Sequence, residues 1–451
     1  MKALLLSTPG PVSSLSIGDI PIPEPGPNEI RVKVHAVSLN PVDYKLAGRG
    51  NDNWAYPHVL GLDVAGSVDA IGSDVVQWQI GDRVFYHGDL TKPGGYAEYA
   101  ITTAHTTAKI PENVSFTEAA AIPCAGLTAY EAVVRRLDVR PEHTVWMQGG
   151  AGGVGGFAVQ LSKNIGATVI TTASGRNHEF VKSLGADHVI DYHTEHVVNT
   201  IMAITNGRGV DRVLGAVDVN TANEGVEVLN FRGGIACVAG MPTISDTTFA
   251  GAKSIHNIAY GGAHTSTNRA AQFDLANMAS EMIALVSDKK IDSMIEQTIT
   301  MEEIPEGLAQ LERASANDLV AVAVSKQQPH SIPFVGVPFG VMMQVVIDDD
   351  SDLNAVVVPT DGDGGKMILF AIPLAIANLC ELGVRDITDD EGALAALALL
   401  HDLEPGVHHE VGRNPFTSDS VERAVNGPGV VRFVVGINSV DRRIQRHREW
   451  P

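Results

Sequence analysis

The sequence predicts an α/β protein: a β-rich first segment, a parallel, doubly wound sheet, and a smaller α+β unit at the end. Three observations lead to this prediction. Apolar and polar residues alternate over residues 30–35, the period of a strand, and Gly and Pro punctuate the segments that follow. Between residues 144 and 239, short apolar runs alternate with helical patterns, as in a parallel sheet covered by helices. After residue 333, strand and helix patterns resume.

The first segment, residues 1–123, is expected to contain strands and turns but no long helix. Turns are indicated by Pro25-Gly26-Pro27, by Gly81-Asp82 and by Pro93-Gly94-Gly95. The strand candidates that follow the alternating run are residues 64–71, 83–86 and 96–101.

The second segment, from about residue 124, alternates between the two kinds of element. Its strand candidates are residues 144–148, 167–173, 188–190, 212–217 and 235–239. Its helix candidates are residues 155–164, 177–184, 197–204, 222–229 and 274–286. A further helix and strand are expected within residues 301–323.

Residues 327–333, rich in Gln and Pro, are expected to link this body to a C-terminal α+β domain, residues 327–451. Its strand candidates are 341–347, 355–358, 367–371 and 430–436, and its helix candidates are 374–382 and 391–400. This unit resembles no family that we can name. Its role is open, and a protein partner for it is one hypothesis.

The composition excludes several classes of partner. The 451 residues include 32 basic and 53 acidic ones, a net charge of −21, which repels nucleic acids and anionic membranes. The longest apolar stretch, residues 367–380, is too short to span a bilayer. Three dispersed cysteines, Cys124, Cys237 and Cys380, exclude a disulfide framework. We therefore expect a cytoplasmic protein that binds neither nucleic acid nor membrane.

The most informative motif is a glycine-rich turn between a strand and a helix. Gly150, Gly152 and Gly155 fit the pattern G-x-G-x-x-G, with Gly153 and Val154 between them. Such glycines allow a tight turn, close approach of a pyrophosphate and close packing of helix on strand. The helix N-terminus then offers free N–H groups to the phosphates. The strand before and the helix after the motif favour a dinucleotide site over an ordinary turn.

The end of the next strand distinguishes the two nicotinamide dinucleotides. An NAD site usually places an acidic residue about 20 positions after the glycines. Residues 171–176 contain no acid but include Ser174 and Arg176, which suit a 2′-phosphate. This favours NADPH, although Arg176 can also be read as the solvated start of a helix.

Together these segments resemble the medium-chain dehydrogenase/reductase superfamily over residues 1–325. The resemblance implies a GroES-like catalytic domain, residues 1–123 and 288–326, interrupted by a Rossmann domain, residues 124–287. Homo-oligomers are common among such relatives. The motifs that carry the resemblance are Asn40-Pro-Val-Asp43, Gly61-Leu-Asp-Val-Ala-Gly66, Gly81-Asp-Arg-Val84, Gly95-Tyr-Ala-Glu-Tyr99, Ala125-Gly-Leu-Thr-Ala-Tyr130 and Leu184-Gly-Ala-Asp187.

The sequence departs from the zinc alcohol dehydrogenases at the ligand positions of the catalytic metal. Asn40 and Leu62 stand where those enzymes have a cysteine and a histidine, and only Cys124 keeps a metal-ligating side chain. The chain therefore looks like the zinc-independent quinone oxidoreductase branch. That resemblance implies that Tyr192 contacts the adenosine 2′-phosphate and that Gly240 lines the nicotinamide pocket.

The expected reaction is hydride transfer from NADPH to a quinone or to the C=C bond of an α,β-unsaturated carbonyl. The catalytic candidates are Asn40, Tyr44, Lys45 and Thr128; His58 is read as a residue at the edge of the core. Asn40 and Lys45 are candidate donors to a developing oxyanion. Tyr44 has an equal interpretation as a packing residue, and Lys45 has an equal interpretation as a solvated surface charge. The alternatives are an inactive NADPH-binding sensor or scaffold and a zinc-type alcohol dehydrogenase.

Overall fold

The computed structural model describes residues 1–243 and 252–313, together with the backbone of four later strands. These strands are β16 (Ala321–Ser325), β17 (Gln344–Val346), β18 (Asn354–Pro359) and β19 (Lys366–Ala371). The chain divides into two compact units, Met1–Gln327 and Gln328–Pro451. No helix among the described residues is long and apolar enough to cross a membrane.

The first part of the chain forms two sheets, the larger of which is completed by β15 and β16 from the return segment, residues 288–326. The larger has the order β15-β16-β3-β5-β6-β8, with β7 also paired to β3, and the smaller has the order β2-β1-β4. In β3, Ile30, Val32 and Val34 are buried as the alternation predicts. These strands are β1 (Lys2–Leu6), β2 (Ser16–Asp19), β3 (Glu29–Ser38), β4 (His58–Val59), β5 (Asp63–Ile71), β6 (Arg83–His87), β7 (Tyr99–Thr103), β8 (Ala108–Lys109) and β15 (Ile295–Ile299).

One strand expected in this region has different bounds, and one helix was not revealed by the sequence. A strand was expected over residues 96–101, but β7 begins only at Tyr99, because the backbone N–H of Tyr96 instead bonds to the carbonyl of Leu60. The sequence did not reveal the short helix α1 (Pro41–Arg49), whose nine residues agree with the expectation that this segment contains no long helix. It buries only Asp43, Leu46 and Ala47, too few apolar positions to show a helical period.

The second part of the chain is a six-stranded sheet with the order β11-β10-β9-β12-β13-β14, in which every neighbouring pair is parallel. This is the strand order of a dinucleotide-binding Rossmann sheet, which reverses direction between β9 and β12. The sequence did not reveal β14, a short and largely polar strand. The strands are β9 (Thr144–Met147), β10 (Thr168–Thr172), β11 (His188–Ile190), β12 (Val210–Gly215), β13 (Leu229–Cys237) and β14 (Ser254–Asn257).

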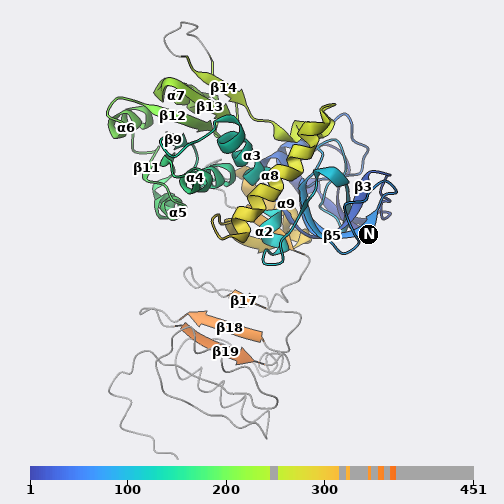
Figure 1. Ribbon diagram of the computed structural model, residues 1–451. Coiled ribbons are helices and arrows are strands. Elements are labelled where there is room, and N and C mark those ends of the chain that lie inside the picture. Colours follow the sequence, from blue (N-terminus) through green and yellow to red (C-terminus); the bar gives the residue numbers. More distant parts are fainter. Residues whose placement is uncertain (244–251, 314–320, 326–343, 347–353, 360–365, 372–451) are drawn as a thin grey trace, which may run out of the picture. The chain divides into compact units, whose positions relative to one another are not determined.

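Helices cover both faces of this sheet. Alternation along β9 sends Trp146 to one hydrophobic cluster, shared with α6 and α7, and Val145 and Met147 to another, shared with α4 and α8. Figure 1 shows α6 and α7 on one side of the strands and α4 and α5 on the other. Besides α1, the described helices of the unit Met1–Gln327, not all of which cover this sheet, are α2 (Phe116–Ala120), α3 (Pro123–Tyr130), α4 (Gly153–Ile165), α5 (His178–Ser183), α6 (Val197–Ile204), α7 (Val219–Val228), α8 (Arg269–Ser287) and α9 (Ile304–Arg313).

Short helical segments complete this unit. A π-helix, η3 (Glu131–Arg136), continues α3. The 3-10 turns are η1 (Val12–Ser14), η2 (Ala104–Thr106), η4 (Gly175–Asn177), η5 (Tyr260–Thr265) and η6 (Met301–Glu303).

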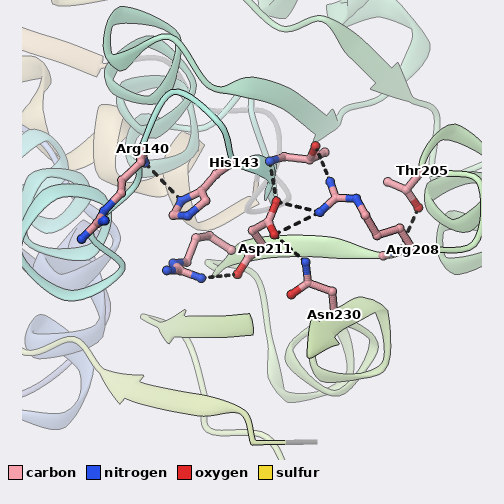
Figure 2. Close-up of polar contacts among 9 residues, drawn as sticks. Arg140, His143, Thr205, Arg208, Asp211 and Asn230 are labelled. Carbon is pink, nitrogen blue, oxygen red and sulfur yellow. Dashed lines mark hydrogen bonds and ion pairs between the residues drawn. The ribbon is translucent and has the colours of Figure 1, made fainter. Parts of the chain in front are cut away.

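A polar network joins the amino-terminal ends of three strands (Figure 2). The carboxylate of Asp211 on β12 accepts hydrogen bonds from the backbone N–H of Thr144, from Asn230 and from Arg208. Burial raises the pKa of Asp211, but these hydrogen bonds outweigh it and hold the pKa below its usual value. The network therefore fixes the end of the sheet opposite to the glycine-rich turn, where parallel sheets bind their ligands.

In the second unit, β17, β18 and β19 form an antiparallel sheet in that order. They coincide with the strand candidates 341–347, 355–358 and 367–371. The strand candidate 430–436 and the helix candidates 374–382 and 391–400 lie outside the described residues.

Candidate active site

The glycine-rich turn connects β9 to α4 at the carboxyl end of the parallel sheet. The N–H of Gly149 donates to Thr172 Oγ1 at 3.2 Å, and the N–H of Gly150 donates to the Thr172 carbonyl at 3.0 Å. A third bond, from the N–H of Gly152 to the Gly149 carbonyl at 2.9 Å, closes the turn. The turn is thus held against the end of β10, beside the point where the strand order reverses.

The glycines are required by the space around them. A Cβ on Gly150 would lie 2.2 Å from Thr171 Oγ1, and one on Gly155 would lie 2.1 Å from the Gly149 carbonyl oxygen. The first N–H groups of α4, those of Gly153, Val154 and Gly155, have no carbonyl four residues earlier within the helix. Close backbone approach and free N–H groups together fit the pyrophosphate of a dinucleotide.

The residues expected near a 2′-phosphate follow β10 and β11. Ser174 is buried and accepts a hydrogen bond from Asn177 Nδ2 at 3.2 Å, whereas Arg176 is exposed. Tyr192 is half-buried beside the ring of His193. The sequence did not show that Asp191 lies here too, with its Oδ2 3.0 Å from where a Gly175 Cβ would be. Both a cation and a carboxylate therefore lie near this loop.

Gly240 follows β13 at the same edge of the sheet. Its φ of 153° is one that side-chain-bearing residues rarely adopt, and a Cβ there would meet Val219 Cγ2 at 2.7 Å. The backbone at this position can therefore lie close to a neighbouring group, as expected for the wall of a nucleotide pocket.

A buried polar cluster lies where β5 begins. Asp63 is fully buried, and its Oδ2 accepts hydrogen bonds from Ser38 Oγ at 2.5 Å and from Asn40 Nδ2 at 2.8 Å. Its Oδ1 accepts one from the backbone N–H of Cys124 at 2.9 Å. Asn40 Nδ2 also donates to Ser38 at 3.2 Å. Asn40, expected to face an oxyanion, thus directs its amide group to Asp63.

A second buried carboxylate, Asp43, lies beside Asp63. Its Oδ2 accepts hydrogen bonds from Tyr96 OH and from the N–H of Asn40, both at 2.9 Å, while its Oδ1 is buried without a partner. Burial raises the pKa of Asp63 to about 7, and burial together with the charge of Asp63 raises that of Asp43 to about 7. Among the described residues, neither carboxylate pairs with a lysine or arginine.

His87 and Cys124 complete this cluster. His87, at the end of β6, pairs in register with Asp63, is 6% exposed, and has a buried Nδ1 without a partner among the described residues. Burial, followed by the effect of His264, lowers the pKa of His87 to about 3, whereas burial raises that of the half-buried Cys124 thiol well above its usual value. His87 was not among the residues expected at the site, although it directly follows the apolar run 83–86.

Helix α3 connects the polar cluster to the glycine-rich turn. Cys124 bonds to Asp63, and the next residue, Ala125, places its Cβ 3.1 Å from where a Cβ on Gly153 would be. One turn later, Thr128 donates from Oγ1 to the Cys124 carbonyl at 2.6 Å and is 8% exposed. Two successive residues of α3, Cys124 and Ala125, therefore link the glycine-rich turn to the buried carboxylates.

The remaining candidates lie apart from these hydrogen bonds. Tyr44 is half-buried on α1, and Lys45 is exposed, with its Nζ 5.9 Å from the centre of the Tyr44 ring. His58 is buried and stacks on Trp54 at 3.9 Å between ring centres, and burial lowers its pKa to about 4.

Comparisons with known proteins agree with this architecture. Residues 26–112 match the alcohol dehydrogenase GroES-like domain, and residues 153–288 match the zinc-binding dehydrogenase family. The structure of the quinone oxidoreductase from Coxiella burnetii is 32% identical, with a TM-score of 0.61 over 72% of this chain and 99% of that one.

Two curated relatives match a shorter stretch. The trans-enoyl reductase tndF of Aspergillus flavipes is 38% identical over 46% of this chain and 64% of its own length. The chloroplast envelope quinone oxidoreductase homolog of Arabidopsis thaliana is 40% identical over 41% of this chain and 59% of its own. The matched stretch thus spans about three fifths of these relatives. With the GroES-like sheet, the Rossmann sheet and these matches, the chain belongs to the medium-chain dehydrogenase/reductase superfamily, in its quinone-oxidoreductase-like branch.

Proposed function

We propose that this chain is an NADPH-dependent oxidoreductase that transfers hydride to a quinone or to the C=C bond of an α,β-unsaturated carbonyl. The observation that carries the proposal is the join at α3, where Ala125 contacts the glycine-rich turn and Cys124 bonds to the buried Asp63. This join brings a glycine-rich turn suited to a dinucleotide next to a buried polar cluster. Relatives that are named quinone oxidoreductases and trans-enoyl reductases support the choice of acceptor.

The residues of the chain divide the work of binding and orientation. NADPH, when bound, supplies the hydride. The N–H groups of Gly153, Val154 and Gly155 hold its pyrophosphate, and Gly240 leaves room for the nicotinamide end. The acceptor would be held in a fixed position relative to NADPH. The entropy cost of bringing the two reactants together is then part of binding and does not add to the barrier of hydride transfer.

The acceptor chemistry explains why zinc-type ligands are not needed for this reaction. Hydride addition to a quinone or enone places negative charge on an oxygen through conjugation, so a protein donor or water suffices to protonate the product. Lys45 on α1 is our candidate donor to that oxygen, with Tyr44 beside it. Asn40 and Thr128 act as positioning residues, since their donor atoms bond to Asp63 and to the Cys124 carbonyl.

The preference for NADPH rests on Arg176, Ser174 and Tyr192. Replacing Arg176 with alanine is expected to raise KM for NADPH about 10- to 100-fold, because a charge-assisted hydrogen bond to the 2′-phosphate is lost. KM for NADH, which lacks that phosphate, is expected to change less than about twofold. Steady-state kinetics with both coenzymes measures this difference.

Lys182→Ala is the matched control for this experiment, because Lys182 is a nearby exposed cation on α5 that is already paired with Glu179. It is expected to leave both KM values unchanged. An equal effect of Arg176→Ala on the two coenzymes would refute its assignment to the 2′-phosphate and would direct attention to Asp191 as a ribose ligand.

The acidic composition and the few, dispersed cysteines favour a cytoplasmic location. We further propose a homo-oligomer, by analogy with the superfamily, and a protein partner as the role of residues 327–451.

A further inference from the structure

We propose that Asp63, His87 and Cys124 form a binding site for a divalent transition-metal ion, best suited to Zn²⁺. One ligand atom from each residue lies within 4.8 Å of the other two. This set shares only Cys124 with the zinc ligand positions of the alcohol dehydrogenases, where the chain has Asn40 and Leu62 instead.

The three residues are held together by the fold. Asp63 begins β5 and His87 ends β6, and the two are opposite each other in the antiparallel register. Cys124 belongs to α3, whose start is tied to Asp63 by the bond from the Cys124 N–H at 2.9 Å. Strands β5 and β6 and helix α3 therefore position a carboxylate oxygen, a ring nitrogen and a thiol sulfur close together.

An independent observation points to a missing ligand at this place. His87 is 6% exposed, and its Nδ1 is buried without a hydrogen-bond partner among the described residues. A buried, unpaired ring nitrogen costs free energy comparable to a lost hydrogen bond. A metal ion that accepts the lone pair of the ring would remove that cost.

The surroundings of Asp63 also suit a metal ligand. Its Oδ1 accepts a single hydrogen bond, from Cys124, so one lone pair stays available for coordination. Ser38 and Asn40 hold its Oδ2, and carboxylate ligands in metal sites are typically oriented by such outer hydrogen bonds.

The charge balance favours a cation. Asp43 and Asp63 are both fully buried, and among the described residues no lysine or arginine neutralises them. A divalent ion bound by the Asp63 carboxylate and the Cys124 thiolate carries a charge equal and opposite to theirs. With the metal bound, Asp43 would lie next to a neutral metal–ligand group instead of next to a second uncompensated carboxylate.

The ligand types select the metal. A mixed oxygen, nitrogen and sulfur set suits zinc, whereas calcium and magnesium prefer oxygen ligands alone. Three protein ligands leave a fourth tetrahedral position for water or another small molecule. Metal binding here does not depend on the proposed reduction of quinones or enones, and the test below measures binding directly.

The first test measures the stoichiometry and the ligands. The full chain is stripped with a chelator, dialysed against Zn²⁺ and analysed for metal. We expect one zinc per chain, and we expect His87→Gln and Cys124→Ser each to weaken binding at least about 100-fold, since even outer-shell changes cost 10- to 100-fold. Cys237→Ser is the control, because Cys237 is a buried thiol on β13 outside this cluster.

A second test identifies the sulfur ligand independently of affinity. Co²⁺ added to the stripped chain should give a thiolate-to-cobalt absorption band that persists in Cys237→Ser and disappears in Cys124→Ser. Thermal unfolding of each stripped variant shows whether it is folded, and zinc should raise the melting temperature of the unsubstituted chain and of Cys237→Ser but not of His87→Gln or Cys124→Ser. Less than one zinc per chain, or binding that survives both His87→Gln and Cys124→Ser, would overturn the proposal.

Discussion

Gly155→Ala is expected to raise the dissociation constant of NADPH at least about 100-fold, a loss of about 2.7 kcal/mol of binding free energy. The added Cβ would lie 2.1 Å from the Gly149 carbonyl oxygen, which is backbone and has no rotamer to move away. The start of α4 must therefore shift from β9, and its N–H groups lose their position toward the pyrophosphate. Fluorescence titration of the chain with NADPH measures the change.

The same substitution should lower the free energy of unfolding by about 2–3 kcal/mol, as overpacking does. Helix propensity alone predicts an increase in the free energy of unfolding instead, because alanine is favoured over glycine within a helix by about 0.5–1 kcal/mol. Gly48→Ala separates the two effects, since a Cβ at Gly48 on α1 meets nothing within 4 Å. We expect that control to be stabilised slightly and to bind NADPH normally. Unchanged affinity in Gly155→Ala would contradict the assignment of the turn.

Phe157→Ala is expected to lower the free energy of unfolding by about 3–5 kcal/mol, the usual cost of removing a buried aromatic ring. Phe157 lies on α4 with no exposed surface and packs in the cluster that joins α3, α4 and α8 to the sheet. Because α4 also carries the glycine-rich turn, NADPH binding should weaken together with stability. Urea unfolding, with and without NADPH, measures both effects.

Phe231→Ala is the matched control, because the same ring is removed from a site on β13 that is 63% exposed. Its effect on unfolding should stay within about 0.5 kcal/mol. A loss below about 1 kcal/mol in Phe157→Ala would show that α4 is not held by this cluster.

Periodic features of the chain were visible in the sequence. The alternation in β3, the order of strands and helices from β9 to β13 and the glycine motif were all predicted, and β11 and α6 have the predicted bounds. The structure departs from prediction where local signals are weak. Helix α1 is short, β14 is polar, and α4 begins at Gly153, earlier than the predicted residue 155, because glycines in the first turn hide the helical pattern.

The polar cluster was harder to predict, because tertiary contacts create it. Asp63 and Cys124 are 61 positions apart, and His87 meets Asp63 only through the register of β5 and β6. The sequence predicts Asn40 as a donor to substrate, yet its side-chain amide donates to Asp63 and Ser38, contacts that residue type alone does not reveal. Sequence motifs located the neighbourhood of the site, whereas side-chain partners required the fold.

The most direct test of the proposed function is steady-state oxidation of NADPH and NADH by the full chain with a panel of quinones, enones and saturated ketones. We expect turnover with quinones or enones, little with saturated ketones, and a kcat/KM for NADPH at least about tenfold above that for NADH. Treatment with a chelator should leave this turnover intact. Tight NADPH binding without turnover of any quinone or enone would contradict the account and would support the inactive sensor or scaffold instead.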